Sequence, residues 1–328
     1  MFPITRMRRL RKNSKLRDIV REVKLAKEDL IYPIFFKEDL KDLEKEEILS
    51  MPEEFRYSLD AGVNYAKELE EKGLKSIIVF GIPSMKDETG TSSRATDGII
   101  QKAIRKLKKE TNLVVISDVC LCQYTNHGHC GVVNLNEDYD EGIEVSNDES
   151  LDYLAQMAVS HAEAGVDIVA PSDMMDGRVG VIREVLDEYG FEDLPIMSYS
   201  VKYASAFYEP FREAACSAPS EGNRKSYQMD PGNIKEATRE CELDILEGAD
   251  FLMVKPALGF LDIIKLVESN FDLPIVAYNV SGEYAMIMSA IASGYLTEAA
   301  IYESVLSIKR AGADLIITNF TPHLLDKL

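Results

Sequence analysis

Eight short apolar runs, separated by longer amphipathic segments, constrain the fold of this chain more than any other feature of its sequence. The runs are rich in β-branched residues and are continuously apolar, which is typical of strands buried on both faces of a parallel sheet. They lie at residues 30–36, 76–82, 113–119, 166–172, 195–200, 251–257, 274–280 and 315–320.

The segments between these runs show helical periodicity and end in glycine. The clearest helical segments are 59–72, 151–164, 235–247 and 297–310, and they are followed by Gly73, Gly165, Gly248 and Gly312. Glycine just past a helix is a common stop signal. Strands that alternate with helices through right-handed crossovers predict an α/β fold, a (β/α)8 TIM barrel, and a doubly wound open sheet is the alternative.

The charge of the chain is unevenly distributed. The net charge of the 328 residues is -19, but residues 1–27 contain ten Lys or Arg and two acidic residues, a charge of +8 that leaves -27 for the remainder. We therefore interpret residues 1–27 as a basic N-terminal arm and residues 28–328 as a single catalytic barrel. The acidic barrel disfavours nucleic acid and membrane partners, and we expect the arm to lie on a neighbouring subunit.

Three of the five cysteines, Cys120, Cys122 and Cys130, follow the third run in the spacing C-x-C-x7-C. Thiolates are ligands that Zn²⁺ prefers, and three protein ligands leave a fourth position open, so the spacing predicts a zinc site of the catalytic type. Two alternatives are that the thiols pack together without a metal, or that His127 and His129 complete a closed structural site. The cysteine usage indicates a reducing, cytoplasmic location.

Two lysines are candidates for covalent chemistry. Lys255 directly follows Leu252, Met253 and Val254 in a buried run, where loss of hydration and a second ammonium from Lys202 would lower its pKa. A neutral amine attacks carbonyls, so the pair predicts Schiff-base chemistry. A structural ion pair is the alternative for Lys255, and a solvated loop position is the alternative for Lys202.

Polar residues gather where the predicted strands end, and barrel enzymes carry their chemistry at these ends. Two long connections, at about residues 119–150 and 203–233, leave the same face. The guanidinium groups in the second connection suit an anionic substrate, although a salt-bridged surface loop is the alternative. The candidates at the strand ends are Asp118, Ser172, Tyr278 and Ser281, and those in the second connection are Tyr208, Arg212, Arg224 and Gln228.

Together these segments resemble the porphobilinogen synthase family, also called 5-aminolevulinate dehydratase, over essentially the whole chain. The resemblance implies a hydro-lyase that condenses two 5-aminolevulinate molecules to porphobilinogen with loss of two waters, an early step toward haem, sirohaem and corrins. The matching stretches are DVCLCQYTNHGHCG, APSDMMDGRVG, MSYSVKYASAFYEPFREA, SYQMDPGN, EGADFLMVKPA and YNVSGEYAM.

The resemblance also implies roles for individual residues. Lys255 matches the Schiff-base lysine of the first, or P-side, substrate, and Lys202 matches that of the second, or A-side, substrate. The three cysteines match the ligands of a zinc ion that polarises the A-side molecule. The remaining matches are Asp118 and Ser172 for proton transfer, Arg212, Arg224 and Gln228 around the A-side carboxylate, Tyr278 and Ser281 on the P-side, and Tyr208 as a further substrate contact.

Two further implications concern assembly and regulation. Glu240 matches a glutamate that helps to hold an allosteric magnesium ion, and the family assembles as octamers through the N-terminal arm. One position departs from the family, because Asn319 stands where a tyrosine usually contacts the P-side carboxylate, and its amide has a shorter reach. Two other functions stay open: an aldolase-type lyase that uses Lys255 alone, and a zinc-holding assembly protein without turnover.

Overall fold

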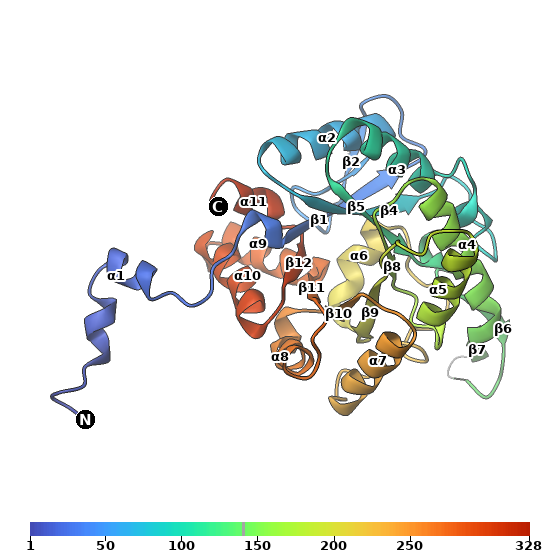
Figure 1. Cartoon of the computed structure of the whole chain (residues 1–328). Coiled ribbons are helices and arrows are strands. Elements are labelled where there is room, and N and C mark those ends of the chain that lie inside the picture. Colours follow the sequence, from blue (N-terminus) through green and yellow to red (C-terminus); the bar gives the residue numbers. More distant parts are fainter. Residues whose placement is uncertain (140–141) are drawn as a thin grey trace.

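The computed structural model describes residues 1–139 and 142–328. Eight parallel strands form the wall of a barrel, and each apolar run forms most of one of them (Figure 1). Two strands extend past their runs, because β1 ends at Lys37 and β9 ends at Lys202. The strands are β1 (Leu30–Lys37), β4 (Ser76–Ile82), β5 (Val114–Val119), β8 (Ile168–Pro171), β9 (Met197–Lys202), β10 (Phe251–Lys255), β11 (Ile275–Asn279) and β12 (Leu315–Thr318).

The strand order is β8-β5-β4-β1-β12-β11-β10-β9, so the last strand pairs with the first. The two ends of this order meet through a bridge between Val169 and Ile196, which nearly closes the barrel. An open doubly wound sheet would leave these two strands apart as edges. The predicted (β/α)8 barrel is therefore confirmed, and the alternative is wrong.

Helices surround the barrel and begin or end close to the predicted positions (Figure 1). The helix before the fourth barrel strand differs most from its prediction. This helix, α4, begins at Asn147 and not at the predicted residue 151. Its first turn contains Asp148 and Glu149, which favour a helix N-terminus but carry no apolar periodicity. The helices are α2 (Leu59–Glu71), α3 (Ile99–Glu110), α4 (Asn147–Glu163), α5 (Arg178–Glu188), α7 (Lys235–Leu246), α8 (Leu261–Asn270), α9 (Ser281–Ala292), α10 (Ala299–Ala311) and α11 (Thr321–Leu325).

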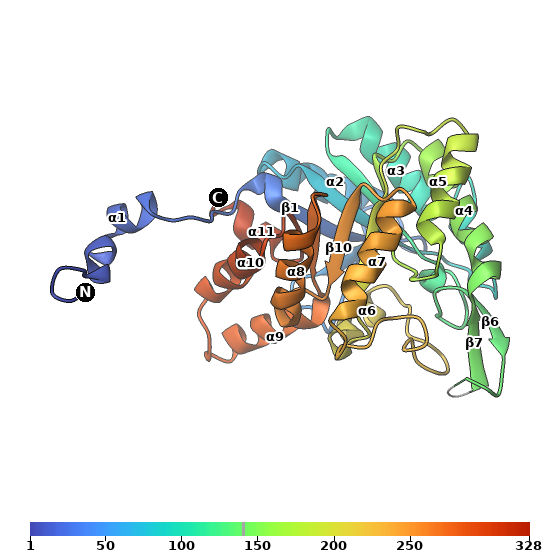
Figure 2. The same ribbon diagram turned by 60° about the horizontal axis from the view of Figure 1, so that its bottom comes forward.

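The two long connections contain secondary structure of their own. The first includes an antiparallel hairpin of β6 (Val132–Leu135) and β7 (Ile143–Ser146), and the second includes the short helix α6 (Glu209–Ala214). Figure 2 shows α6, α9 and this hairpin at the same end of the barrel. A second hairpin, β2 (Lys45–Glu47) and β3 (Phe55–Tyr57), pairs through β3 with the end of β1.

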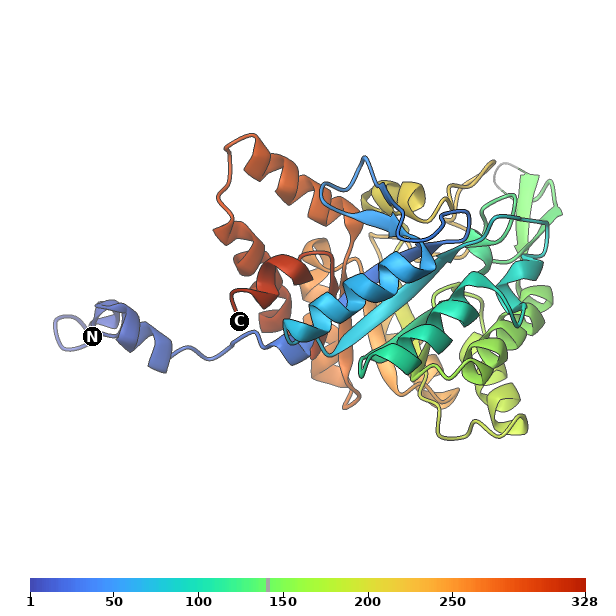
Figure 3. The same ribbon diagram turned by 90° about the horizontal axis from the view of Figure 1, so that it is seen from above.

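The segment before β1 extends away from the barrel (Figure 3). It contains the short helix α1 (Ser14–Ile19), and Leu25 is its first buried residue. Exposed apolar side chains, including Phe2, Ile4 and Leu10, alternate with its basic residues. Among the described residues, no helix is long and apolar enough to span a membrane.

Candidate active site

Lys202 and Lys255 end neighbouring strands of the barrel and are register partners in the ladder between β9 and β10. Their exposed fractions are 5% and 4%, so both amines are withdrawn from solvent. The Nζ atoms lie 5.7 Å and 5.2 Å from the ring centre of Tyr199, which shows that both side chains point to one place. Both lysines line the same cavity at the strand ends. Lys202 is the last residue of β9 and is buried, so the solvated loop position for it is wrong.

Aromatic side chains enclose the Lys255 amine. Its Nζ lies 4.1 Å from the ring centre of Tyr278, 4.7 Å from that of Phe211 and 5.4 Å from that of Tyr208. Burial among these rings, reinforced by the Lys202 charge, lowers the pKa of Lys255 to about 7. A large fraction of this amine is therefore uncharged near neutral pH, as nucleophilic attack on a carbonyl requires.

Acid and amide groups border the two amines. Lys202 donates a hydrogen bond to the backbone carbonyl of Ser172, and Gln123 Nε2 donates to Asp118 Oδ2 over 3.2 Å. Burial raises the pKa of Asp118, although the Ser172 hydroxyl and the two lysines oppose this shift. Within the described residues, no carboxylate oxygen lies within 4.0 Å of Lys255 Nζ, which disfavours the structural ion pair.

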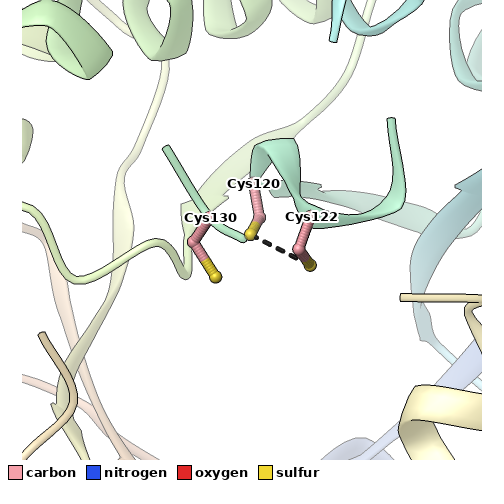
Figure 4. A group of neighbouring side chains, drawn as sticks. All are labelled: Cys120, Cys122 and Cys130. Carbon is pink, nitrogen blue, oxygen red and sulfur yellow. Dashed lines mark hydrogen bonds between the residues drawn. The ribbon is translucent and has the colours of Figure 1, made fainter. Parts of the chain in front are cut away.

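The three cysteines form one buried cluster (Figure 4). Cys122 lines the same cavity as the two lysines. Their sulfur atoms all lie within 4.8 Å of one another, and the Sγ atoms of Cys120 and Cys122 are 3.3 Å apart. Hydrogen bonds from Cys120 and Cys122 lower the pKa of Cys130, whereas burial raises the pKa of Cys120. Three soft donors at this spacing fit a thiophilic metal ion such as Zn²⁺, which would displace the remaining protons.

Neither histidine of the same loop completes this cluster. His129 Nδ1 lies 3.1 Å from the Tyr227 hydroxyl, and its Nε2 lies 2.9 Å from the Glu221 carbonyl oxygen. His127 Nε2 lies 3.1 Å from the Glu88 carbonyl oxygen, and its Nδ1 accepts the His129 backbone N–H. With these nitrogens engaged, neither histidine joins the three thiols, and the closed alternative is not supported.

The second connection brings two arginines to the lysines. A small cavity of about 20 Å³ is lined by Arg212 and Arg224 together with both lysines and Cys122. Arg224 Nη2 donates to the Gly128 carbonyl oxygen over 2.8 Å and to the Ser217 carbonyl oxygen over 2.6 Å. The cavity is also lined by Asp118, Gln123, Ser172, Tyr208 and Phe211.

Several buried donors at this end of the barrel have no hydrogen-bond partner within the described residues. They include the Nε atoms of Arg212 and Arg224, Nε2 of Gln228 and Oγ of Ser281. Gln228 does not line the lysine cavity but borders the adjoining one, together with Arg212 and Arg224. Buried polar groups are normally paired, so these donors could serve a polar ligand.

Asn319 has an unexpected neighbour in Glu54, which lies just before β3. Glu54 is 3% exposed and accepts a hydrogen bond from the Tyr32 hydroxyl over 2.8 Å. Burial raises the pKa of Glu54 to about 8, although the side chains of Tyr32 and Asn319 oppose this shift. Glu54 is therefore mainly uncharged at neutral pH.

Glu240 lies apart from the lysines. It is on α7, half-buried, and lines a separate cavity with Asp176 and Glu236. Burial raises its pKa to about 7, and the neighbouring carboxylates contribute to this increase. The structure therefore separates the residue predicted for magnesium from those predicted for catalysis.

Three residues of the site were missed from the sequence: Gln123, Tyr199 and Phe211. Tyr199 is an odd number of positions from Lys202, which in a regular strand places the two side chains on opposite faces. A register irregularity between β9 and β10 brings them together. For Phe211 and Gln123, the only indication in the sequence was that they lie next to Arg212 and Cys122.

Comparison with known proteins decides the family. A sequence profile described as "Delta-aminolevulinic acid dehydratase" matches residues 4–327. The chain belongs to this family. A delta-aminolevulinic acid dehydratase from Methanothermus sociabilis is 60% identical over 327 residues, which cover 100% of this chain and 99% of the relative. The dehydratase from Bacillus subtilis is 53% identical and covers 95% of this chain and 94% of its own.

A solved structure supports the same assignment. The delta-aminolevulinic acid dehydratase (porphobilinogen synthase) of Toxoplasma gondii ME49, in complex with the reaction product porphobilinogen, superposes with a TM-score of 0.94. Its sequence is 40% identical, and the match covers 100% of this chain and 93% of that one. The expected family, the barrel fold and the hydro-lyase class are thus confirmed for this dehydratase.

Proposed function

We propose that this chain condenses two 5-aminolevulinate molecules to porphobilinogen with loss of two waters, through imines on Lys255 and Lys202. The observation that carries the proposal is the register pairing of these two buried lysines beside the cysteine cluster. The product bound to the Toxoplasma gondii relative supports the same reaction. The product would enter tetrapyrrole synthesis, toward haem, sirohaem and corrins.

Lys255 is the first nucleophile in this proposal. Its uncharged amine adds to the ketone carbon of the P-side substrate, and loss of water leaves a C=N bond between substrate and Nζ. The low pKa of Lys255 makes the free amine available near pH 7. The aromatic rings around it exclude bulk water and so oppose hydrolysis of the imine.

Lys202 performs the same chemistry on the A-side substrate. Because the two lysines are paired in register, the two bound substrates react as if within one molecule. Proton transfers accompany both dehydrations and the closure of the ring. Asp118 and Ser172 serve these transfers, since the raised pKa of Asp118 lets its carboxyl hold a proton beside the amines.

The unpaired donors hold the two substrate carboxylates. Arg212, Arg224 and Gln228 bind the A-side carboxylate, because guanidinium groups offer the paired donors that a carboxylate accepts. On the P-side, the unpaired Ser281 hydroxyl binds the carboxylate together with Tyr278, and Asn319 stands where the family usually has a tyrosine. Tyr208 packs beside Lys255 and limits the space at the reacting carbon.

Cys120, Cys122 and Cys130 hold zinc in this proposal. When bound there, zinc supplies Lewis acidity toward an oxygen of the A-side substrate. The chain's own contribution is to hold three thiolates in a buried cluster that leaves one side open toward the cavity. The five free cysteines are compatible with a reducing cytoplasm, where we expect the enzyme to act.

Two further parts of the proposal concern regulation and assembly. Glu240 contributes to an allosteric magnesium site with Asp176 and Glu236, which line the same cavity. The arm of residues 1–27, exposed over most of its length before Leu25, packs on a neighbouring subunit of a homo-octamer. Loss of magnesium activation in Glu240→Ala, and dissociation on removal of the arm, are the corresponding results to expect by kinetics and analytical ultracentrifugation.

The test of the function is a colorimetric assay for a pyrrole formed from 5-aminolevulinate, with and without a zinc chelator. The purified protein should form the pyrrole, and the chelator should abolish its formation. Circular dichroism of the chelated protein should keep the spectrum of the folded barrel. Absence of pyrrole from the zinc-loaded protein would reject the proposed reaction.

A further inference from the structure

Side-chain cations surround the carbonyl groups at the C-terminal end of α6. Arg56 donates to the carbonyl oxygen of Glu213 over 2.6 Å and to that of Ala214 over 2.8 Å. Lys86 donates to the carbonyl oxygen of Cys216. The Glu213 carbonyl oxygen also accepts the backbone N–H of Cys216 over 3.1 Å. The last carbonyls of a helix carry partial negative charge, so cations stabilise them.

Arg56 is itself fixed to the barrel wall. It lies on β3, where it pairs in register with Phe35 of β1, and it is only 6% exposed. Its remaining nitrogen forms an ion pair with Glu46 of β2, and Lys37 of β1 lies 2.6 Å from the same carboxylate. The guanidinium group therefore connects α6 to the first barrel strand through bonds from all of its nitrogens.

The position of α6 determines what lies over the lysines. Phe211, on this helix, is 4.7 Å from Lys255 Nζ and packs edge-on against Phe80 at 5.2 Å between ring centres. Arg212 follows directly and lines the lysine cavity. A displacement of α6 would thus move both a wall of the Lys255 pocket and a cation of the A-side subsite.

Close backbone contacts support the same placement of the segment around α6. A Cβ atom on Gly282 would lie 2.5 Å from the Phe207 carbonyl oxygen. A Cβ atom on Gly128 would lie 2.4 Å from the Ala218 carbonyl oxygen, at a positive φ of 72°. The segment is packed tightly at both places, and Arg56 adds directed bonds between them.

We infer that Arg56 is a positioning residue, which fixes α6 so that Phe211 and Arg212 stand over Lys255 and Lys202. The inference rests on the proposed function for its kinetic consequence. Arg56 touches neither substrate nor reacting atoms and acts through α6. Its planar fork reaches two successive carbonyls, which the single ammonium of a lysine cannot do in the same geometry.

Three variants test this role. Arg56→Gln removes the charge and the fork, and Arg56→Lys keeps the charge beside Glu46 while offering a single donor group. Arg183→Gln is the matched control, because Arg183 also donates to two carbonyl oxygens, of Phe191 and Leu194, each over 2.7 Å. These carbonyls precede β9 and lie at the opposite end of the barrel from the lysines.

The measurements are the kinetics of pyrrole formation and backbone amide exchange of residues 209–217 without substrate. For Arg56→Gln we expect KM to rise about tenfold and kcat to fall less than about threefold, since charged hydrogen bonds that orient Arg212 are lost. Amide exchange at 209–217 should accelerate, while that of the barrel strands stays unchanged. Arg56→Lys should show smaller changes in the same direction.

Unchanged KM and unchanged exchange in Arg56→Gln would overturn the inference, as would an equal rise in KM in Arg183→Gln. If Arg56→Gln does not fold, Arg56→Lys decides the question by the same two measurements. If the wild-type protein forms no pyrrole, the proposed function fails. Amide exchange then still decides, independently, whether Arg56 fixes α6.

Discussion

Lys202 and Lys255 occupy paired positions on adjacent parallel strands, and both are buried. Neighbouring strands lie about 4.8 Å apart, so the side chains of such a pair leave the barrel wall side by side. Two ammonium groups with so little exposure to solvent repel each other strongly. The pairing itself therefore favours the uncharged amine on Lys255 and links the fold to imine chemistry.

The pH dependence of covalent trapping follows from this lowered pKa. The pKa of Lys255 is about 7, so its reactive amine fraction rises as pH increases through 7 and levels off above about pH 8. The rate at which borohydride fixes 5-aminolevulinate to Lys255 should follow the same curve. Samples quenched at successive times and analysed by peptide mass spectrometry measure this rate at each pH. A midpoint of the pH curve near the ordinary lysine pKa would contradict the account.

Replacing the neighbouring lysine should shift this midpoint. In Lys202→Met the like charge is gone, so the pKa of Lys255 should rise, while burial still keeps it below the ordinary value. The trapping midpoint on Lys255 should therefore move to higher pH, although pyrrole formation should fall by more than about a thousandfold with the loss of a covalent catalyst. A midpoint that stays in place would show that the two amines do not interact.

The cysteine cluster should control metal content without controlling the fold. We expect wild-type protein to bind one zinc ion per chain, and Cys130→Ser to bind it far more weakly, because one of three thiolate ligands is lost. Activity should fall with the metal content, whereas the thermal midpoint should change little. Cys241→Ser, a buried cysteine on α7 outside the cluster, is the matched control and should keep its zinc.

Glu54 should make stability depend on pH. Its pKa is about 8 in the folded protein and about 4.5 in an unfolded chain, so the folded state holds a proton that the unfolded state releases between these values. Wild-type stability should therefore decrease across this range relative to Glu54→Gln, by up to a few kcal/mol. Chemical denaturation from pH 5 to pH 9 measures the difference.

Glu47, an exposed residue on β2 of the same hairpin, provides the control for this series. No ion pair or hydrogen bond of its side chain is found within the described residues, so Glu47→Gln should follow the pH dependence of the wild-type stability. A constant difference between Glu54→Gln and wild type across the series would show that Glu54 is ionised in the folded state. In that case its role beside Asn319 would need another explanation.

The strands and the main site residues could be predicted from sequence because their signals are local. Continuously apolar runs followed by polar residues place Asp118, Ser172 and Lys255 at strand ends without any knowledge of tertiary structure. The three cysteines lie so near one another in the chain that a single loop gathers them. These positions needed only periodicity and spacing, whereas the individual roles came from the resemblance to the family.

The remaining features depend on contacts between distant segments. The irregularity in β9 that turns Tyr199 toward Lys202 leaves no mark in the pattern of the strand. Glu54 and Arg56 lie in a short hairpin segment, and only the tertiary fold brings them to Asn319 and to the end of α6. From sequence alone, a charged residue in such a segment is expected to be exposed to solvent, because its distant partner cannot be identified.

The most direct test of the central claim is borohydride reduction in the presence of 5-aminolevulinate, followed by peptide mass spectrometry of the zinc-loaded protein. The account predicts the mass of reduced substrate on Lys255, with no such adduct on that peptide in Lys255→Met. An adduct on neither Lys255 nor Lys202, from protein that still forms the pyrrole, would contradict it.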